Sequence, residues 1–247
     1  GIEFHPGVEY RHIMVAPADL DKADYVPPHD LSDKPIVLPT GPAAARLIEL
    51  QERSREVLAK FDLKANQIWL WGQGFQPQMP SFADQYGLEA GLCSAVDLVR
   101  GLGVLTGVEC VDVDGMTAGY DTDYAAQRET ALDSLADGAD LFVIHIEATD
   151  EAGHAGNVAE KVRSLELWDR EVLGPLVPGL DKLGPWRLLF LPDHATPLRL
   201  KTHTPDPVPY LLVDSAVDGP GGVYTEDGVA DTEAVPGHAL MARLIDA

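Results

Sequence analysis

The sequence predicts an α/β fold in which helices flank a mostly parallel sheet. Two short apolar runs, residues 141–146 and 186–191, have the length expected of strands that are buried on both faces. From residue 79 onward, helix-length and strand-length segments alternate, which is typical of a parallel sheet covered by helices. With 247 residues, 45% of them hydrophobic, the chain can bury one large core or two modest ones.

Residues 1–78 are predicted to form a first, smaller α+β unit. We expect strands at residues 8–15 and 66–71, because both segments are rich in apolar and aromatic residues. Residues 43–61 carry apolar positions among charges at helical spacing, which predicts an amphipathic helix. The segment 16–35 is rich in Pro and Asp and is predicted to be a loop.

Residues 79–247 are predicted to form a second unit, which a Pro- and Gln-rich connector at residues 75–80 joins to the first. The elements expected here are a helix at 90–101, a strand at 109–113, a helix at 122–135, a strand at 141–146, a long helix after His154, strands at 186–191 and 210–213, a loop with one short strand at 217–236, and a final helix at 237–245.

The stretch 140–157, DLFVIHIEATDEAGHAGN, carries the first chemical signal. If a helix begins after the apolar run, Asp150 and His154 share one face of its first turn. Open α/β sheets usually bind their ligands at the carboxyl ends of parallel strands, so this pair suits a divalent metal. The same spacing is also common on solvated helices, and alone it does not distinguish the two readings.

A second group of polar side chains follows the apolar run 186–191. Asp193 and His194 come directly after it, and His203 lies in the proline-stiffened loop THTPDPVP. Together with Asp150 and His154 they form a set of carboxylate and imidazole ligands. Such ligands suit Mn²⁺ or Zn²⁺ well, with Mg²⁺, Fe²⁺ or Co²⁺ as further options. The alternative reading is a set of loop caps and surface histidines.

These motifs resemble a known family. DEAGH followed by Gly156, then PDH, then THTPDPVP are similar to the blocks of the archaeal-type cofactor-independent phosphoglycerate mutases, members of the alkaline phosphatase superfamily. EFHPGVEYRH, IWLWGQG, SAVDLVRGLG and GYDTDYAAQ follow the order of that family's blocks over nearly the whole chain. Thr149, Ala155 and Asn157 depart from the family pattern, but none of these departures removes a proposed ligand.

The resemblance implies an alkaline-phosphatase-like sheet with an inserted cap domain. Residues 79–247 would then be the C-terminal part of the metal-binding domain, and residues 1–78 part of the cap. It further implies two divalent ions and an interconversion of 2- and 3-phosphoglycerate through a phosphoenzyme. In that scheme Asp150, His154 and His203 hold one ion, and Asp193 with His194 holds the other.

The resemblance also implies that the cap contacts the substrate. It places Arg11 and His12 on a strand facing the phosphate site, with His29 and Asp30 in the same cleft. An Arg suits phosphate because its planar fork can bond two oxygens at once. Without the resemblance, the sequence is equally consistent with Arg11 being a surface residue on an edge strand.

Two elements that the family pattern requires were not found in the sequence. In such enzymes an N-terminal strand supplies an Asp to one metal, and a Ser or Thr beyond it becomes phosphorylated. Asp114-Gly115 follows an apolar run, but the resemblance gives that position no such role. We therefore expect Gly1 to lie inside the cap, the nucleophile to lie outside this chain, and the isolated chain to be inactive.

The charge of the chain argues against some classes of partner, and its cysteines indicate the redox state of its compartment. The formal net charge is -22 and the sequence pI is about 4.5, which argues against nucleic acids and anionic membranes as partners. Cys93 and Cys110 both adjoin apolar residues and are expected to be free thiols, as in a reducing cytoplasm. The expected partners are a small phosphorylated acid and the N-terminal segment, while the oligomeric state stays open.

Two other functions remain open. The same metals could serve a related phosphotransferase or hydrolase acting on another phosphorylated or phosphonate acid. Alternatively, the chain could be a non-catalytic metal-binding domain that acts by binding a partner. His145 interrupts an apolar strand and is expected to be a core histidine, and His238 is expected to be a structural or surface residue. The segment 120–123 is expected to cap a helix through Thr122 or Asp121.

Overall fold

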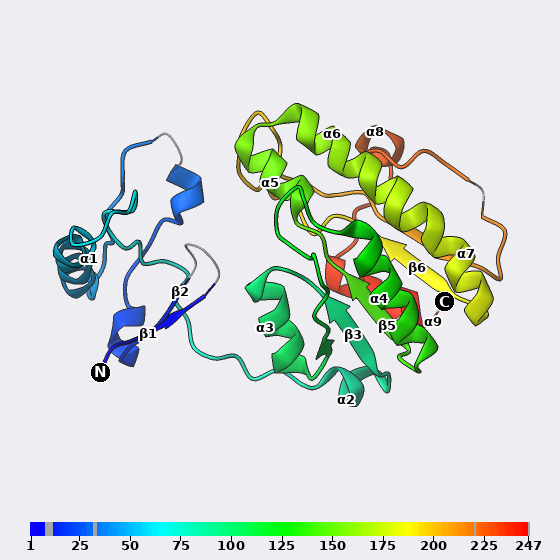
Figure 1. Cartoon of the computed structure of the whole chain (residues 1–247), viewed down its shortest axis with the longest axis horizontal. Helices are drawn as coiled ribbons and strands as arrows, with labels where there is room; N and C mark the ends of the chain where they lie inside the picture. Colours follow the sequence, from blue (N-terminus) through cyan, green and yellow to red (C-terminus); the bar gives the residue numbers. More distant parts are fainter. Residues whose placement is uncertain (8–11, 32–33, 220, 247) are drawn as a thin grey trace. The chain divides into compact units, whose positions relative to one another are not determined.

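A computed structural model shows that the chain forms two compact units (Figure 1), Gly1–Gln78 and Met79–Ala247. The described residues are 1–7, 12–31, 34–219 and 221–246, without the side chain of His29. Within them, no helix combines the length and the apolar character that crossing a membrane requires.

The first unit combines a small antiparallel sheet with a helix. Strand β1 (Glu3–Pro6) pairs with β2 (His12–Val15) so that Phe4 lies opposite Met14. Helix α1 (Ala44–Leu58) is the long helix of this unit (Figure 1). The helix expected at residues 43–61 is therefore present.

The core of the first unit lies at the start of α1. Leu47 of α1 is fully buried and clusters with Leu20, which belongs to the 3-10 turn η1 (Ala18–Asp21). A second 3-10 turn, η2 (Pro28–Leu31), follows in the loop. Met14 packs against the same cluster from β2, so the sheet and the helix share one apolar core.

The strand expected at residues 66–71 is wrong: these residues form no regular element. Their polar groups bond to side chains and loop carbonyls instead of to a neighbouring strand. The Ile68 amide donates to Ser54 Oγ at 3.0 Å, and Trp69 Nε1 donates to the Val26 carbonyl at 2.9 Å. The segment is thus held against α1 and the loop without needing a strand partner.

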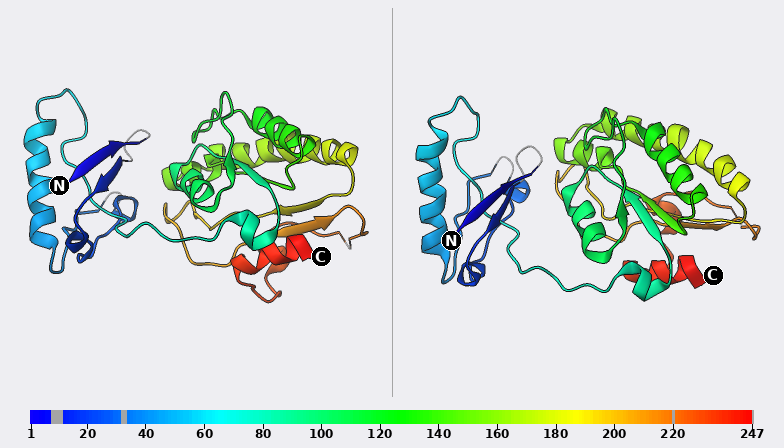
Figure 2. Two further views of the ribbon diagram at one scale, coloured as in Figure 1. Left: turned by 90° about the horizontal axis from the view of Figure 1, so that it is seen from below. Right: turned by 60° about the horizontal axis from the view of Figure 1, so that its bottom comes forward.

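The second unit contains a parallel sheet of order β4-β3-β5. Its strands are β3 (Ala90–Cys93), β4 (Glu109–Cys110) and β5 (Leu141–Ile144), and the helices before β5 are α2 (Phe82–Tyr86), α3 (Asp97–Thr106) and α4 (Tyr124–Ala136). Helix α4 packs against both β3 and β5. In Figure 2 the green and yellow-green helices cover one side of the strands and the red C-terminal helix lies on the other. The predicted fold class is confirmed.

The helix expected at residues 90–101 is wrong in its first half, where β3 forms the middle of the sheet. Ala90 and Gly91 are poor strand formers, so the local composition does not indicate a strand here. Gly91 is needed for packing, because a Cβ there would lie 2.8 Å from Cδ2 of Phe142 on β5. The small residues of β3 therefore make room for larger side chains of its neighbour.

The long helix expected after β5 is a series of helical segments. They are α5 (Ala148–Ala155), α6 (Val158–Leu167), a π-helical segment η3 (Trp168–Leu173) and α7 (Gly174–Leu183). Gly156 ends α5 with a left-handed conformation, φ 66°, and Asn157 then caps α6. Ala148 and Val172 are fully buried and pack with Tyr124 of α4, so this series covers the sheet through α4.

The C-terminal part adds a separate pair of strands. Strand β6 (Arg187–Phe190) pairs antiparallel with β7 (Leu211–Asp214), and helix α9 (Leu240–Asp246) contacts β6. The short strand expected within residues 217–236 is wrong, because the described residues there form a short helix, α8 (Glu226–Val229), among turns. A 3-10 turn, η4 (Gly237–Ala239), precedes α9 and contains His238.

Candidate metal centre

The first two candidate ligands lie on α5, immediately beyond the carboxyl end of β5. The Asp150 amide donates to the Glu147 carbonyl at 2.8 Å, which closes the first turn of the helix. One turn later His154 lies beside Asp150, with 3.2 Å between His154 Nε2 and Asp150 Oδ2. The shared helical face expected from the spacing of these residues is confirmed.

The loop between β6 and β7 brings two more candidates to the same place. His203 Nε2 lies 3.0 Å from His154 Nε2 and 3.5 Å from Asp150 Oδ1. The His194 ring stacks on the His203 ring, with 3.8 Å between their centroids. Residues almost fifty positions apart in the sequence therefore converge on one point.

Asp193 extends the group at one end, because its Oδ2 lies 3.3 Å from His194 Nε2. All five predicted residues therefore form one continuous series of contacts. Within it, Asp150, His194 and His203 each offer a ligand atom within 4.8 Å of the other two. This grouping cuts across the expected division into two sets of ligands, and the division itself stays a prediction.

The spacing of the nitrogen and oxygen atoms suits a divalent cation. Around an ion with bonds of about 2.1 Å, neighbouring ligand atoms lie roughly 3.0 Å apart in an octahedron and 3.4 Å apart in a tetrahedron. His154 Nε2 lies 3.0 Å from His203 Nε2 and 3.2 Å from Asp150 Oδ2, and His203 Nε2 lies 3.5 Å from the other oxygen of Asp150, Oδ1. The residues present therefore fit a metal ion without a large rearrangement.

A backbone carbonyl fixes the protonation pattern of His154. Its Nδ1 lies 3.0 Å from the Lys201 carbonyl oxygen, which can only accept, so Nδ1 must carry the proton. In the neutral ring the lone pair is then on Nε2, the nitrogen that lies 3.2 Å from Asp150 Oδ2 and 3.0 Å from His203 Nε2. Lys201 adopts a left-handed conformation, φ 55°, which is unusual for a residue other than glycine. The sequence analysis did not identify Lys201, because a lysine in a polar loop gives no indication that its backbone carbonyl contacts a candidate ligand.

His145 is not one of the converging side chains. Its Nδ1 lies 2.9 Å from Oγ of the fully buried Ser94, and its Nε2 lies 3.6 Å from Glu147 Oε2. Burial lowers the pKa of His145, although the carboxylates of Asp193 and Asp150 oppose this effect. It is thus a neutral, internally bonded histidine beneath the cluster, as expected for a core residue.

The residues expected to contact the substrate lie in the first unit. Arg11 and the side chain of His29 lie outside the described residues. His12 is exposed on β2, where its Nδ1 accepts from the Gly7 amide at 3.2 Å. Asp30 belongs to η2, and its carbonyl accepts from Lys34 Nζ at 2.9 Å. A substrate role for all four residues stays a prediction.

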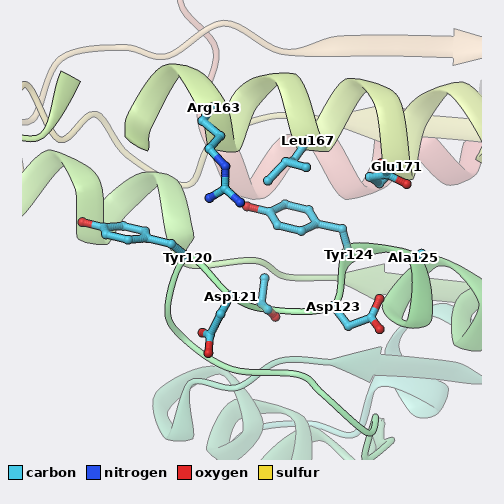
Figure 3. A pocket seen from close by; sticks show the side chains of 9 residues that line it. Tyr120, Asp121, Asp123, Tyr124, Ala125, Arg163, Leu167 and Glu171 are labelled. Atoms are coloured by element: carbon cyan, nitrogen blue, oxygen red, sulfur yellow. The ribbon is translucent and has the colours of Figure 1, made fainter. Parts of the chain in front are cut away.

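The segment 120–125 lines a hollow of about 320 Å³ together with Arg163, Leu167 and Glu171 of the helical series (Figure 3). Its acidic side chains have structural partners: Asp123 Oδ1 accepts from the Ala126 amide at 2.8 Å and caps α4, and Asp121 accepts from Thr117 Oγ1 at 2.8 Å. The segment caps a helix as expected, but the capping residue is Asp123, so the expected assignment to Thr122 or Asp121 is wrong.

Comparison with protein families agrees with the ligand chemistry. The model of a family described as the metalloenzyme superfamily matches residues 31–242, which include all five candidate ligands. The chain belongs to the metalloenzyme superfamily.

Two curated relatives of this metalloenzyme chain carry mutase names. A "probable 2,3-bisphosphoglycerate-independent phosphoglycerate mutase" of Geobacter sulfurreducens is 42% identical over 99% of the chain, and a protein of Methanothrix thermoacetophila with the same name, without "probable", is 45% identical over 88%. The resemblance inferred from the motifs is confirmed. The metalloenzyme chain spans 65% and 58% of the lengths of these two relatives.

Two solved structures share the fold. A cofactor-independent phosphoglycerate mutase of Thermoplasma acidophilum matches 99% of the chain and 65% of its own length, with a TM-score of 0.55 and 21% identity. A protein of Pyrococcus horikoshii matches 81% of the metalloenzyme chain and 62% of its own length, with a TM-score of 0.63 and 24% identity. At these identities the comparison shows a common fold.

Proposed function

We propose that this chain supplies the metal-binding part of a phosphotransferase that interconverts 2- and 3-phosphoglycerate through a phosphoenzyme. The observation that carries the proposal is the convergence of Asp150, His154, His203, His194 and Asp193 in one series of contacts. The names of the curated relatives support the choice of substrate. A role in glycolysis would place the protein in the cytoplasm.

The proposed centre holds two divalent ions, with Mn²⁺ or Zn²⁺ as the favoured metals and Mg²⁺, Fe²⁺ or Co²⁺ as alternatives. Bound ions of this kind activate a hydroxyl nucleophile and neutralise charge on the transferring phosphoryl group. Asp150, His154 and His203 are assigned to one ion, and Asp193 with His194 to the other. His194 lies against His203, so the two sets of ligands adjoin.

We further propose that the phosphorylated Ser or Thr comes from a segment outside this chain. Strand β5 ends the parallel sheet, and no strand among the described residues pairs with its second edge. An unpaired strand edge offers a row of backbone donors and acceptors. Because β5 leads directly to Asp150, a strand added there would place its side chains near the proposed ions.

The first unit is proposed to bind the substrate. Arg11 would grip the carboxylate or phosphate with a bidentate contact, assisted by His12, His29 and Asp30. Such a cover would also exclude water, so that the phosphoryl group returns to glycerate and is not hydrolysed.

The decisive experiment uses the native protein that contains this chain. Its intact mass and metal content are measured on one sample, and conversion of 3- to 2-phosphoglycerate is followed with and without a chelator. We expect a mass above 26.6 kDa, about two divalent ions, and turnover that the chelator abolishes. D150N should lose both the metal and the turnover, whereas D218N, an exposed loop substitution, should keep both.

Three results would contradict the proposal. A native protein of 26.6 kDa with one ion or none, and without turnover, would indicate a non-catalytic metal-binding domain. Release of inorganic phosphate without mutase turnover would indicate a hydrolase. A metal-loaded protein that transfers phosphate only with another phosphorylated or phosphonate acid would indicate a related phosphotransferase.

A further inference from the structure

Thr196 lies between the two groups of candidate ligands. It follows β6 by a few residues and is only 5% exposed. Its Oγ1 contacts Asp150 Oδ1 in a short hydrogen bond and lies 3.2 Å from His194 Nδ1. One hydroxyl group thus touches a ligand assigned to each of the two ions.

The direction of both hydrogen bonds follows from the chemistry of the partners. An ionised carboxylate can only accept, so the single hydroxyl proton of Thr196 must point to Asp150. Oγ1 can then interact with His194 only as an acceptor, which requires the proton of the neutral ring to lie on Nδ1. The lone pair of the neutral ring is then on Nε2, which lies 3.3 Å from Asp193 Oδ2. Because that carboxylate also can only accept, the two atoms do not form a hydrogen bond with each other and are placed as neighbouring ligands of a cation.

The backbone around Thr196 is held from two sides. Its carbonyl accepts from Lys161 Nζ of α6 at 2.7 Å. The preceding residue, Ala195, accepts from the Thr204 amide at 3.0 Å, which ties Thr196 to the loop that carries His203. Its hydroxyl is consequently fixed relative to α5, α6 and the His203 loop at once.

We propose that Thr196 is a positioning residue that presets both Asp150 and His194 for metal binding. It orients one carboxylate oxygen of Asp150 and holds His194 in the tautomer whose Nε2 lone pair can bind a cation. This inference rests on the proposed metal centre. Outer hydrogen-bond partners of metal ligands generally contribute a factor of about 10 to 100 in metal affinity.

The test compares T196V with T204V. Both substitutions exchange a hydroxyl for a methyl group of similar volume in the same segment, but the buried Thr204 Oγ1 has no hydrogen-bond partner in the described structure. For T196V we expect Mn²⁺ binding, measured by electron paramagnetic resonance, to weaken about 10- to 100-fold. T204V should bind Mn²⁺ like the wild type, and T196S, which restores a hydroxyl, should recover most of the affinity.

A second readout needs no metal. In chelator-treated protein at pH 8, nitrogen-15 chemical shifts of the His194 ring should report a proton on Nδ1 in the wild type and T204V. In T196V the ring should show a mixture of tautomers or a proton on Nε2. Unchanged His194 shifts in a folded T196V protein would overturn the inference.

The two readouts separate the inference from the proposed function. If wild-type protein bound no Mn²⁺ while T196V still changed the His194 tautomer, the metal centre would fail, and only the control of the His194 tautomer by Thr196 would stand. If wild-type protein bound Mn²⁺ and T196V bound it equally well, the positioning role would fail and the metal centre would stand.

Discussion

Gly153 explains why the DEAGH motif has a glycine before its histidine. A Cβ at this position would lie 2.6 Å from the Thr196 carbonyl oxygen, which is backbone and cannot move aside easily. We predict that G153A lowers the free energy of unfolding by about 1–3 kcal/mol and also weakens metal binding, because it pushes Thr196 away from Asp150. Urea unfolding with and without Mn²⁺ measures both effects.

Gly101 of α3 provides the matched control, since a Cβ there would meet no atom within 4 Å. G101A should stabilise the protein by roughly 0.5–1 kcal/mol, because alanine loses less backbone entropy in a helix. Equal effects of G153A and G101A would show that the close approach of Thr196 is unimportant.

His145 makes the stability of the protein depend on pH. Burial lowers its pKa below the ordinary value of 6.5, so the unfolded chain binds a proton at a higher pH than the folded chain. The corresponding stability is complete above about pH 6.5 and is lost as the pH falls below that value. We predict that H145Q, measured by urea unfolding in a chelator at pH 7.5 and 5.5, loses less stability across this interval than the wild type. A larger loss in H145Q would contradict the assignment of His145 as a buried neutral residue.

The elements that local pattern could predict are those whose partners lie nearby. The apolar run before DEAGH and the one-turn spacing of Asp150 and His154 are local, so β5 and the start of α5 follow from the sequence. Strand β3 escaped prediction because its small residues serve the Phe142 side chain of another strand. The segment 66–71 has the apolar pattern of a strand. It forms none because Ile68 and Trp69 bond to Ser54 and Val26, distant partners that the pattern does not reveal.

In the candidate site too, features set by nearby residues could be predicted and contacts with distant partners could not. Each of the five predicted ligands has a side chain typical of metal sites, and the motifs that carry them could be recognised one at a time. Thr196 and Lys201 act through a hydroxyl and a carbonyl on partners 46 and 47 positions away. A hydroxyl group or a backbone carbonyl gives no sequence signal for such a distant contact, so these two contacts could be identified only in the structure.

The break between α5 and α6 depends on Asn157. Its Oδ1 accepts from the Glu160 amide at 3.2 Å and caps α6. We predict that N157A lowers the free energy of unfolding by about 1 kcal/mol, whereas N157D retains or slightly increases it because an acidic cap also favours the helix dipole. Thermal unfolding measures both variants, and an unchanged midpoint for N157A would contradict the capping role.

The five candidate ligands all belong to the second unit, so metal binding should stabilise that unit alone. At a free metal concentration of about 100 times Kd, a ligand that binds only the folded state stabilises it by about 2.7 kcal/mol. We predict that Mn²⁺ slows hydrogen exchange in α5 and in residues 193–204, while exchange in α1 of the first unit stays as it is in a chelator.

The control for this measurement is D150N, which removes one carboxylate charge and should abolish the protection by Mn²⁺. Protection that persists in D150N would mean that the ion is held by other residues. Protection that extends to α1 would mean that metal binding in the second unit is coupled to the stability of the first, and that the two compact units unfold together. If D150N loses the protection by Mn²⁺ and exchange in α1 never changes, the stability gained from metal binding lies in α5 and residues 193–204, which carry the ligands.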